Sequence, residues 1–98
     1  MKKIEALAKM AFFNGNNFAQ SNTEVKVSRT KVEYYLHGNL IAWRLKNSLC
    51  AECSLAGWNT RTTRSRLNSL GAQITQRKGV IYADGIQIDE TTYFYINL

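Results

Sequence analysis

The sequence predicts a single small domain of the α+β class, with an antiparallel β-meander between two helices and further strands at the C-terminus. Three patterns carry this prediction. Residues 2–13 repeat apolar side chains at helical spacing, residues 23–55 alternate apolar and polar side chains between turns, and residues 57–71 look like a short capped helix. A chain of 98 residues can bury a core without a metal or a disulfide, so we expect one domain over residues 1–98.

An N-terminal helix is expected over residues 2–13. Its apolar side chains recur at i, i+3 and i+4 spacing: Ile4, Leu7, Ala8, Ala11 and Phe12. Asn14-Gly15 follows, and glycine readily adopts the left-handed conformation that ends helices. The apolar stripe is narrow, which favours packing against a sheet. Residues 14–22 are polar and rich in turn residues, with Phe18 as an anchor.

Four half-buried antiparallel strands are expected next. The alternating segments are residues 23–28, 31–37, 40–46 and 49–55. Gly38-Asn39 is typical of tight hairpin turns, and Asn47-Ser48 turns the chain again. After the central helix, residues 72–77 and 80–83 are expected to form a hairpin through Lys78-Gly79. Asp84-Gly85 is a further hairpin signal before Ile86, and residues 92–98 close the chain as a strand.

The central helix within residues 57–71 is the predicted working surface. Asn59 or Thr60 suits its N-cap, and Gly71 suits the position after its end. One face, with Thr63, Leu67 and Leu70, is expected to pack on the sheet, and Trp58 is expected to act as a hydrophobic staple before the cap.

The cations of this helix lie where they do not favour its stability. Arg61 falls in the first turn, where the helix dipole disfavours a positive charge, and Arg64 repeats that charge one turn later. An anion seated at the helix start would relieve both effects. The candidate binding residues are Thr60, Arg61, Thr62, Arg64 and Arg66, with Arg77 and Lys78 of the following hairpin. In the alternative interpretation, the three helix arginines point to solvent or pair with acids such as Glu33, Glu52, Asp84 or Glu90.

Charge is segregated along the chain. Thirteen Lys and Arg residues against seven Asp and Glu residues give a net charge of +6, and residues 54–83 contain no acid. This distribution indicates a polyanionic partner, although a charge of this size also serves solubility alone.

Other functional interpretations have less support. Cys50 and Cys53 are three apart on an expected strand, so they face opposite sides, and with the lone His37 they cannot supply four zinc ligands. No catalytic constellation is visible, so we expect neither an enzyme nor a metal or cofactor. No segment approaches the ~20 apolar residues that span a bilayer, and no export signal opens the chain, so we expect an intracellular protein without membrane contact.

The sequence contains two further patterns that bear on nucleic-acid binding. Tyr34, Tyr35 and Trp43 either form a platform on the sheet that stacks bases or pack in the core. A winged helix-turn-helix is disfavoured because residues 49–55, directly before the central helix, alternate as a strand.

Four segments together resemble a group of small, mostly uncharacterised bacteriophage-encoded proteins. They are Asn22-Thr23-x-Val25, Leu36-His37-Gly38-Asn39-x-Ile41-Ala42, Gly57-Trp58-x-Thr60-x-Thr62-Thr63-x-x-Arg66-Leu67-Asn68 and Gln76-Arg77-Lys78-Gly79-Val80. The resemblance implies a viral origin and no particular activity.

For a basic phage protein, we expect a nucleic-acid-binding protein of the host cytoplasm that uses the arginine-rich helix and the hairpin. The alternative is an inhibitor of a host protein or of a defence nucleoprotein complex. An oligomer that pairs through the N-terminal helix or the strand edge at residues 93–96 also remains open.

Overall fold

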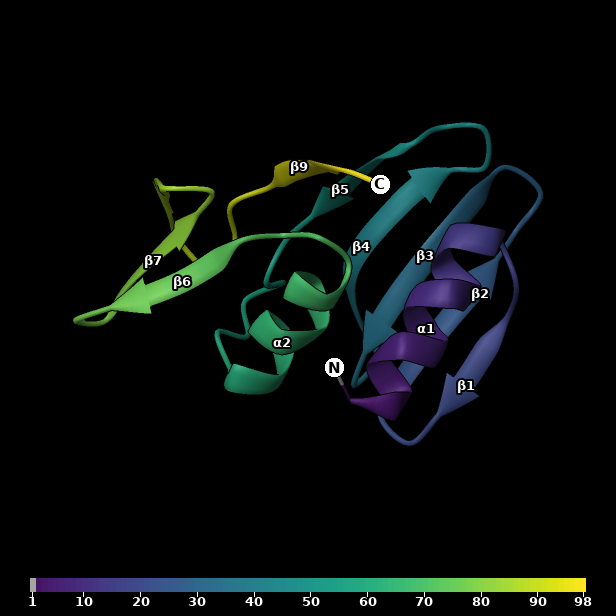
Figure 1. Ribbon diagram of the computed structural model, residues 1–98, viewed down its shortest axis with the longest axis horizontal. Coiled ribbons are helices and arrows are strands. Elements are labelled where there is room, and N and C mark those ends of the chain that lie inside the picture. Colours follow the sequence, from purple (N-terminus) through teal and green to yellow (C-terminus); the bar gives the residue numbers. More distant parts are fainter. Residues whose placement is uncertain (1) are drawn as a thin grey trace.

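The computed structural model describes residues 2–98, and it confirms the predicted α+β class (Figure 1). The elements are α1 (Lys3–Asn14), β1 (Phe18–Gln20), β2 (Thr23–Val27), β3 (Lys31–Leu36), β4 (Asn39–Leu45), β5 (Cys50–Cys53), α2 (Arg61–Ser69), β6 (Ile74–Arg77), β7 (Val80–Ala83), β8 (Ile86–Ile88) and β9 (Phe94–Asn97). Six strands form one antiparallel sheet in the order β1-β2-β3-β4-β5-β9, and β6-β7-β8 form a second, smaller sheet.

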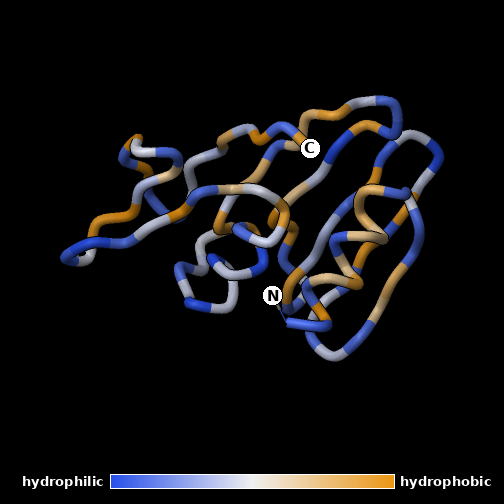
Figure 2. Tube along the Cα trace, viewed as in Figure 1, coloured by the Kyte–Doolittle hydropathy of each residue, from blue (hydrophilic) through white to orange (hydrophobic). Residues whose placement is uncertain are grey.

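The hydrophobic core lies between the large sheet and the two helices. Alternation along β3 buries Val32, Tyr34 and Leu36 on the side of α1, and the Phe12 ring meets Tyr34 edge to face at 5.9 Å between centroids. Figure 2 shows the same division in hydropathy, with apolar segments along the central strands and a hydrophilic β6–β7 turn. No helix of residues 2–98 is long and apolar enough to cross a membrane.

A buried arginine from the sheet holds the C-terminal end of α1. Gly15 ends the helix in the left-handed conformation with φ 71°, as predicted. Arg44 of β4 then donates from Nε and Nη2 to the Phe12 carbonyl at 3.0 and 2.8 Å, and from Nη2 to the Phe13 carbonyl at 2.9 Å. Since the last carbonyls of a helix lack partners within it, these bonds satisfy groups that burial would otherwise destabilise.

Two strand pairings of the large sheet go beyond the prediction. The turn-rich segment after α1 contains β1, whose Phe18 pairs with Val25 of β2. The last strand, β9, leaves the C-terminal hairpins and pairs with β5, so that Ile96 lies opposite Ala51. Both are edge strands of the large sheet, and their pairing depends on contacts that a local pattern does not show.

Candidate functional site

The start of α2 carries the first predicted binding residues. Thr60 caps the helix, since its Oγ1 accepts the Thr63 N–H at 3.1 Å and lies 2.8 Å from the Thr63 hydroxyl. Thr63 and Leu67 are buried, as predicted. Arg61 is exposed and Thr62 half-buried, and neither side chain forms a hydrogen bond or ion pair with residues 2–98. The helix therefore begins with a free guanidinium.

Arg64 joins this helix to the smaller sheet. Its Nη1 donates to the side-chain carbonyls of Asn59 and of Gln76, the latter at 3.0 Å, and the Asn59 amide donates to Gln76 at 2.9 Å. Both partners are neutral, so the positive charge of Arg64 is not compensated by a carboxylate. The contacts bring the end of β6 beside the start of α2.

Arg77 and Lys78 follow Gln76 directly, at the end of β6 and in the β6–β7 turn. Both are exposed, and neither has a carboxylate within ion-pair distance among the described residues. Lys78 has φ 51°, a left-handed conformation that fits the tight turn it forms with Gly79. We call Arg61, Arg64, Arg77 and Lys78 the basic surface.

Two acids lie close to part of this surface without pairing with it. Asp89 and Glu90 line a shallow recess together with Asn59 and Gly79. The Asp89 carboxylate accepts hydrogen bonds from the Thr91 backbone N–H and from the hydroxyls of Thr91 and Thr92, at 2.8 to 2.9 Å. These bonds hold the pKa of Asp89 below its ordinary value. Among residues 2–98, neither acid lies within ion-pair distance of the four cations.

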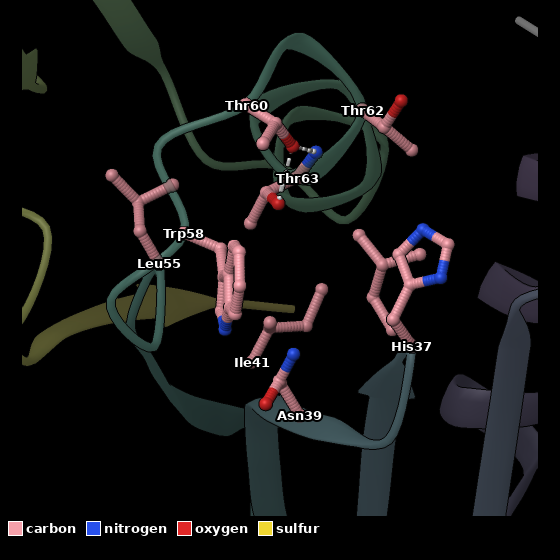
Figure 3. A pocket seen from close by; sticks show the side chains of 9 residues that line it. His37, Asn39, Ile41, Leu55, Trp58, Thr60, Thr62 and Thr63 are labelled. Atoms are coloured by element: carbon pink, nitrogen blue, oxygen red, sulfur yellow. Dashed lines mark hydrogen bonds between the residues drawn. The ribbon is translucent and has the colours of Figure 1, made fainter.

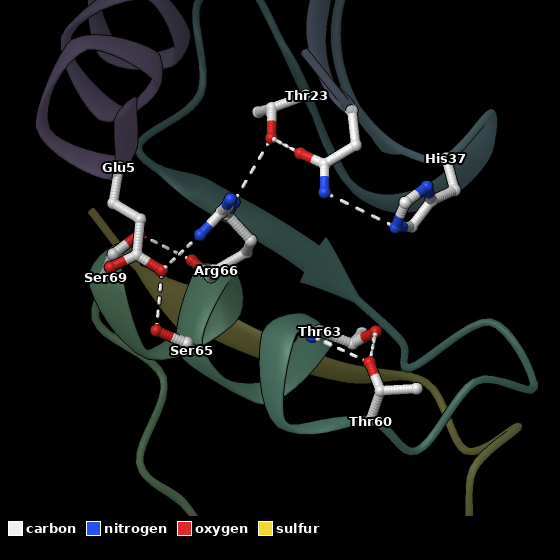
Figure 4. A network of polar contacts seen from close by, with 9 residues as sticks. Glu5, Thr23, His37, Thr60, Thr63, Ser65, Arg66 and Ser69 are labelled. Carbon is white, nitrogen blue, oxygen red and sulfur yellow. Dashed lines mark hydrogen bonds and ion pairs between the residues drawn. The ribbon is translucent and has the colours of Figure 1, made fainter. Parts of the chain in front are cut away.

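Arg66 corrects the prediction, because it is not offered to a partner. Its Nη1 lies 2.7 Å from Glu5 Oε2, and both side chains are only 5% exposed (Figure 4). The Ser65 hydroxyl donates to the same carboxylate oxygen at 2.6 Å. Burial raises the pKa of Glu5, but the bonds from Ser65 and Arg66 outweigh that effect and hold it below its ordinary value. Glu5 is not among the four acids that the sequence suggests as partners of the helix arginines.

A hydrogen-bond chain runs from this buried pair to the surface at His37 (Figure 4). Arg66 Nε donates to Thr23 Oγ1 at 3.1 Å, so the Thr23 hydroxyl donates onward to Asn22 Oδ1 at 2.9 Å. The Asn22 amide nitrogen then lies 3.3 Å from His37 Nε2. Since an amide nitrogen only donates, His37 Nε2 accepts, and the proton of the neutral ring sits on Nδ1. Arg66 thus positions groups of the sheet rather than a ligand.

A pocket of about 390 Å³ opens between the start of α2 and the β3–β4 turn (Figure 3). We call it the Trp58 pocket. Its apolar base is buried. Trp58, which was predicted to act as a hydrophobic staple, is 57% exposed and forms one wall of the pocket. His37 lies across from the Trp58 ring, and Asn39 lies at the β4 end. Its lining residues are Leu36, His37, Asn39, Ile41, Leu55, Trp58, Thr60, Thr62 and Thr63.

Sequence reasoning missed this pocket, although it used most of its residues. Two of the segments that carry the phage resemblance, those containing His37 and Trp58, meet here. The available signal was a tryptophan in a glycine-flanked loop before a helix. The pairing of that loop with the β3–β4 turn depends on the tertiary fold.

The other face of the large sheet carries aromatic side chains that no helix of residues 2–98 covers. Trp43 Nε1 donates to Glu52 at 2.9 Å, and the Tyr95 hydroxyl donates to the same carboxylate at 2.9 Å. Lys31 lies 5.1 Å from the Trp43 ring centroid. Tyr35 shares this face, whereas Tyr34 is buried on the opposite one. Of the predicted aromatic platform, two members are therefore accessible and one belongs to the core.

The two cysteines of β5 differ in exposure. Cys50 is exposed and Cys53 buried, and both are free thiols, as expected for opposite faces of a strand. Burial raises the pKa of the Cys53 thiol to about 12, which keeps it protonated and unreactive. No group of three His, Cys, Asp or Glu side chains within residues 2–98 is placed to hold a metal ion.

Comparison with protein families adds an origin to this geometry. The model of the family described as Kyanoviridae Gp96 protein matches residues 1–96. The chain belongs to this family. No curated protein and no solved structure matches it. Membership in the Kyanoviridae Gp96 family confirms that the protein is of a phage-encoded type, and the match includes the N-terminal helix and C-terminal strands that the sequence resemblance left outside. The family description names no activity, so a function can be inferred only from the residues and geometry described above.

Proposed function

We propose that this protein binds nucleic acid through the basic surface. The observation that carries the proposal is the arrangement of its four cations. They come from the helix and from the hairpin, the bonds of Arg64 to Asn59 and Gln76 hold those two elements together, and no cation of the surface is paired with a carboxylate. Arginine and lysine side chains that have no carboxylate partner among residues 2–98 are suited to phosphate contacts.

The contrast with the two buried arginines, Arg44 and Arg66, supports this assignment. Arg66 forms an ion pair with Glu5, and Arg44 donates its hydrogen bonds to helix carbonyls. The protein thus has buried cations with structural partners and surface cations without partners. The four cations of the basic surface lie within residues 54–83, a stretch that contains no acidic residue, so phosphates are the fitting ligands.

Binding of a labelled oligonucleotide, measured by fluorescence anisotropy at low salt, tests the proposal. Replacing Arg61, Arg77 and Lys78 by glutamine should weaken binding at least tenfold, since each removes a phosphate contact. The control replaces Arg29 and Lys46, two exposed cations of loops at the other end of the large sheet, and should retain most of the affinity. A variant of Arg77 and Lys78 alone matches it in the number of charges removed. Equal losses in both variants would refute a localised surface.

The aromatic face of the large sheet favours a second function, binding of a host protein. Exposed tyrosine and tryptophan side chains are enriched at protein interfaces, and Trp43, Tyr35 and Tyr95 gather on one uncovered face. This version corresponds to a phage inhibitor of a host protein or of a defence nucleoprotein complex. A stoichiometric host partner that persists after nuclease treatment, and that Trp43→Ala abolishes, would support it over nucleic-acid binding.

A further inference from the structure

The Trp58 pocket combines an accessible aromatic wall with a buried apolar base. Trp58 is 57% exposed, whereas Leu36 and Ile41 below it are each 2% exposed. In Figure 3 the indole ring stands edge on, with the space between Ile41, Thr63 and His37 along one of its faces. A flat ring can therefore lie against the indole face with apolar side chains beneath it.

Polar groups without internal partners surround this space. Among the described residues, the Asn39 side-chain amide and the Thr62 hydroxyl form no hydrogen bond. His37 accepts from Asn22 through Nε2, which leaves Nδ1–H free to donate. In Figure 3 the Asn39 amide points toward this space, whereas the Thr62 oxygen and the His37 nitrogens point away from it. The Asn39 amide alone supplies both a donor and an acceptor, which suits a planar ligand with a mixed polar edge.

A cation lies between two pocket-lining residues in the chain. Arg61 lies in the chain between Thr60 and Thr62, which both line the pocket. Asn59 follows Trp58 and bonds to Gln76, which precedes Arg77. The pocket and the basic surface are thus neighbours along the same two segments of chain.

We propose that the Trp58 pocket takes one unpaired nucleobase of a single-stranded nucleic acid. The base stacks on Trp58, its polar edge meets the Asn39 amide, and the adjoining phosphate contacts Arg61. This inference rests on the proposed nucleic-acid binding and specifies the class of nucleic acid. A base inside a duplex is already paired and stacked, so only single strands can fill the pocket.

An aromatic side chain of a partner protein fits the observations less well. It would fill the apolar part, but it brings no anion to the unpaired Arg61 and at most one polar atom to the rim. A nucleotide supplies the ring, the polar edge and the phosphate in one unit. The pocket volume of about 390 Å³ lies within the range of small-ligand sites.

The fluorescence of Trp58 reports the stacking. The chain has two tryptophans, so Trp43→Phe leaves Trp58 as the single emitter. Adding the decamers dT10 and rU10 in separate titrations should quench its emission in proportion to occupancy, and the two titrations distinguish DNA from RNA as the source of the base. A 10-base-pair duplex of mixed sequence should leave the emission unchanged. Quenching by the duplex to the same extent would overturn the inference.

The affinity of Trp58 variants provides a second, independent readout. Stacking contributes about 1–3 kcal/mol per base, so Trp58→Leu should weaken decamer binding by about 5- to 150-fold. Trp58→Phe keeps a ring and should lose less, and duplex binding should not change in either variant. Because Trp58 is largely exposed, both variants should fold, which far-UV circular dichroism checks.

The outcomes separate the two proposals. If neither the decamers nor the duplex binds at low salt, the nucleic-acid function itself fails. If both bind with equal affinity and Trp58→Leu changes neither, the basic surface stands and the base pocket is refuted.

Discussion

Removing the guanidinium of Arg66 tests the division between structural and binding arginines. Arg66→Met keeps a long side chain but leaves the Glu5 carboxylate buried, with the Ser65 hydroxyl as its remaining side-chain partner. It also removes the donor to Thr23. Breaking one member of a buried, hydrogen-bonded ion pair costs about 3–5 kcal/mol. Against a typical total stability of about 5–15 kcal/mol, that loss is large.

Urea unfolding at pH 7, followed by circular dichroism, measures this loss. The matched control is Arg64→Met, two positions away on the same helix but half-buried and bonded only to neutral groups, for which we expect about 1 kcal/mol or less. In the double variant Glu5→Gln with Arg66→Met, most of the stability should return, because no buried charge is left unpaired. Equal losses for Arg64→Met and Arg66→Met would refute the reasoning and return Arg66 to the candidate binding residues.

Four further outcomes follow from individual side chains. The pKa of Glu5 is lower in the folded than in the unfolded chain. Its contribution to the free energy of unfolding is therefore present above about pH 4.3 and is lost as the pH falls through the folded-state pKa. In Glu5→Gln, the free energy of unfolding should no longer show this part of the decrease at acid pH. Tyr34→Phe should be neutral or slightly stabilising in urea unfolding, since the buried Tyr34 hydroxyl has no hydrogen-bond partner within residues 2–98; a loss above about 1.5 kcal/mol would contradict this. Thr60→Ala should cost about 1 kcal/mol through the lost cap, while Thr60→Ser retains it. A thiol reagent at pH 8 should modify Cys50 quickly and Cys53 only on unfolding, as peptide mass mapping would show.

Local sequence patterns were sufficient for the elements whose signals are contiguous. Alternation and turn residues located β2 to β5, and the glycine after Asn14 located the end of α1. The N-cap was predicted at Asn59 or Thr60, and the structure places it at Thr60, whose hydroxyl accepts from the first turn. These features depend on neighbours within a few residues, which is the range that periodicity and capping rules describe.

The misses share a dependence on partners far away in the chain. Arg66 meets Glu5, sixty-one residues earlier, and that contact decides that the guanidinium is buried. Likewise, β9 pairs with β5 across the whole of α2 and the smaller sheet, and the Trp58 pocket forms only once α2 approaches the turn after Leu36. No local pattern distinguishes a buried arginine from an exposed one on the same helix. The predicted set of binding cations therefore included Arg66, which the structure buries.

The salt dependence of oligonucleotide affinity tests the central claim most directly. If Arg61, Arg64, Arg77 and Lys78 each contact a phosphate of a single strand, log K should fall with log salt concentration at a slope of about −2.8. Glutamine at Arg61, Arg77 and Lys78 should reduce that slope to about −0.7, while glutamine at Arg29 and Lys46 should leave it unchanged. A slope that is the same in all three proteins, or binding that does not respond to salt, would contradict the assignment of this surface to phosphate contacts.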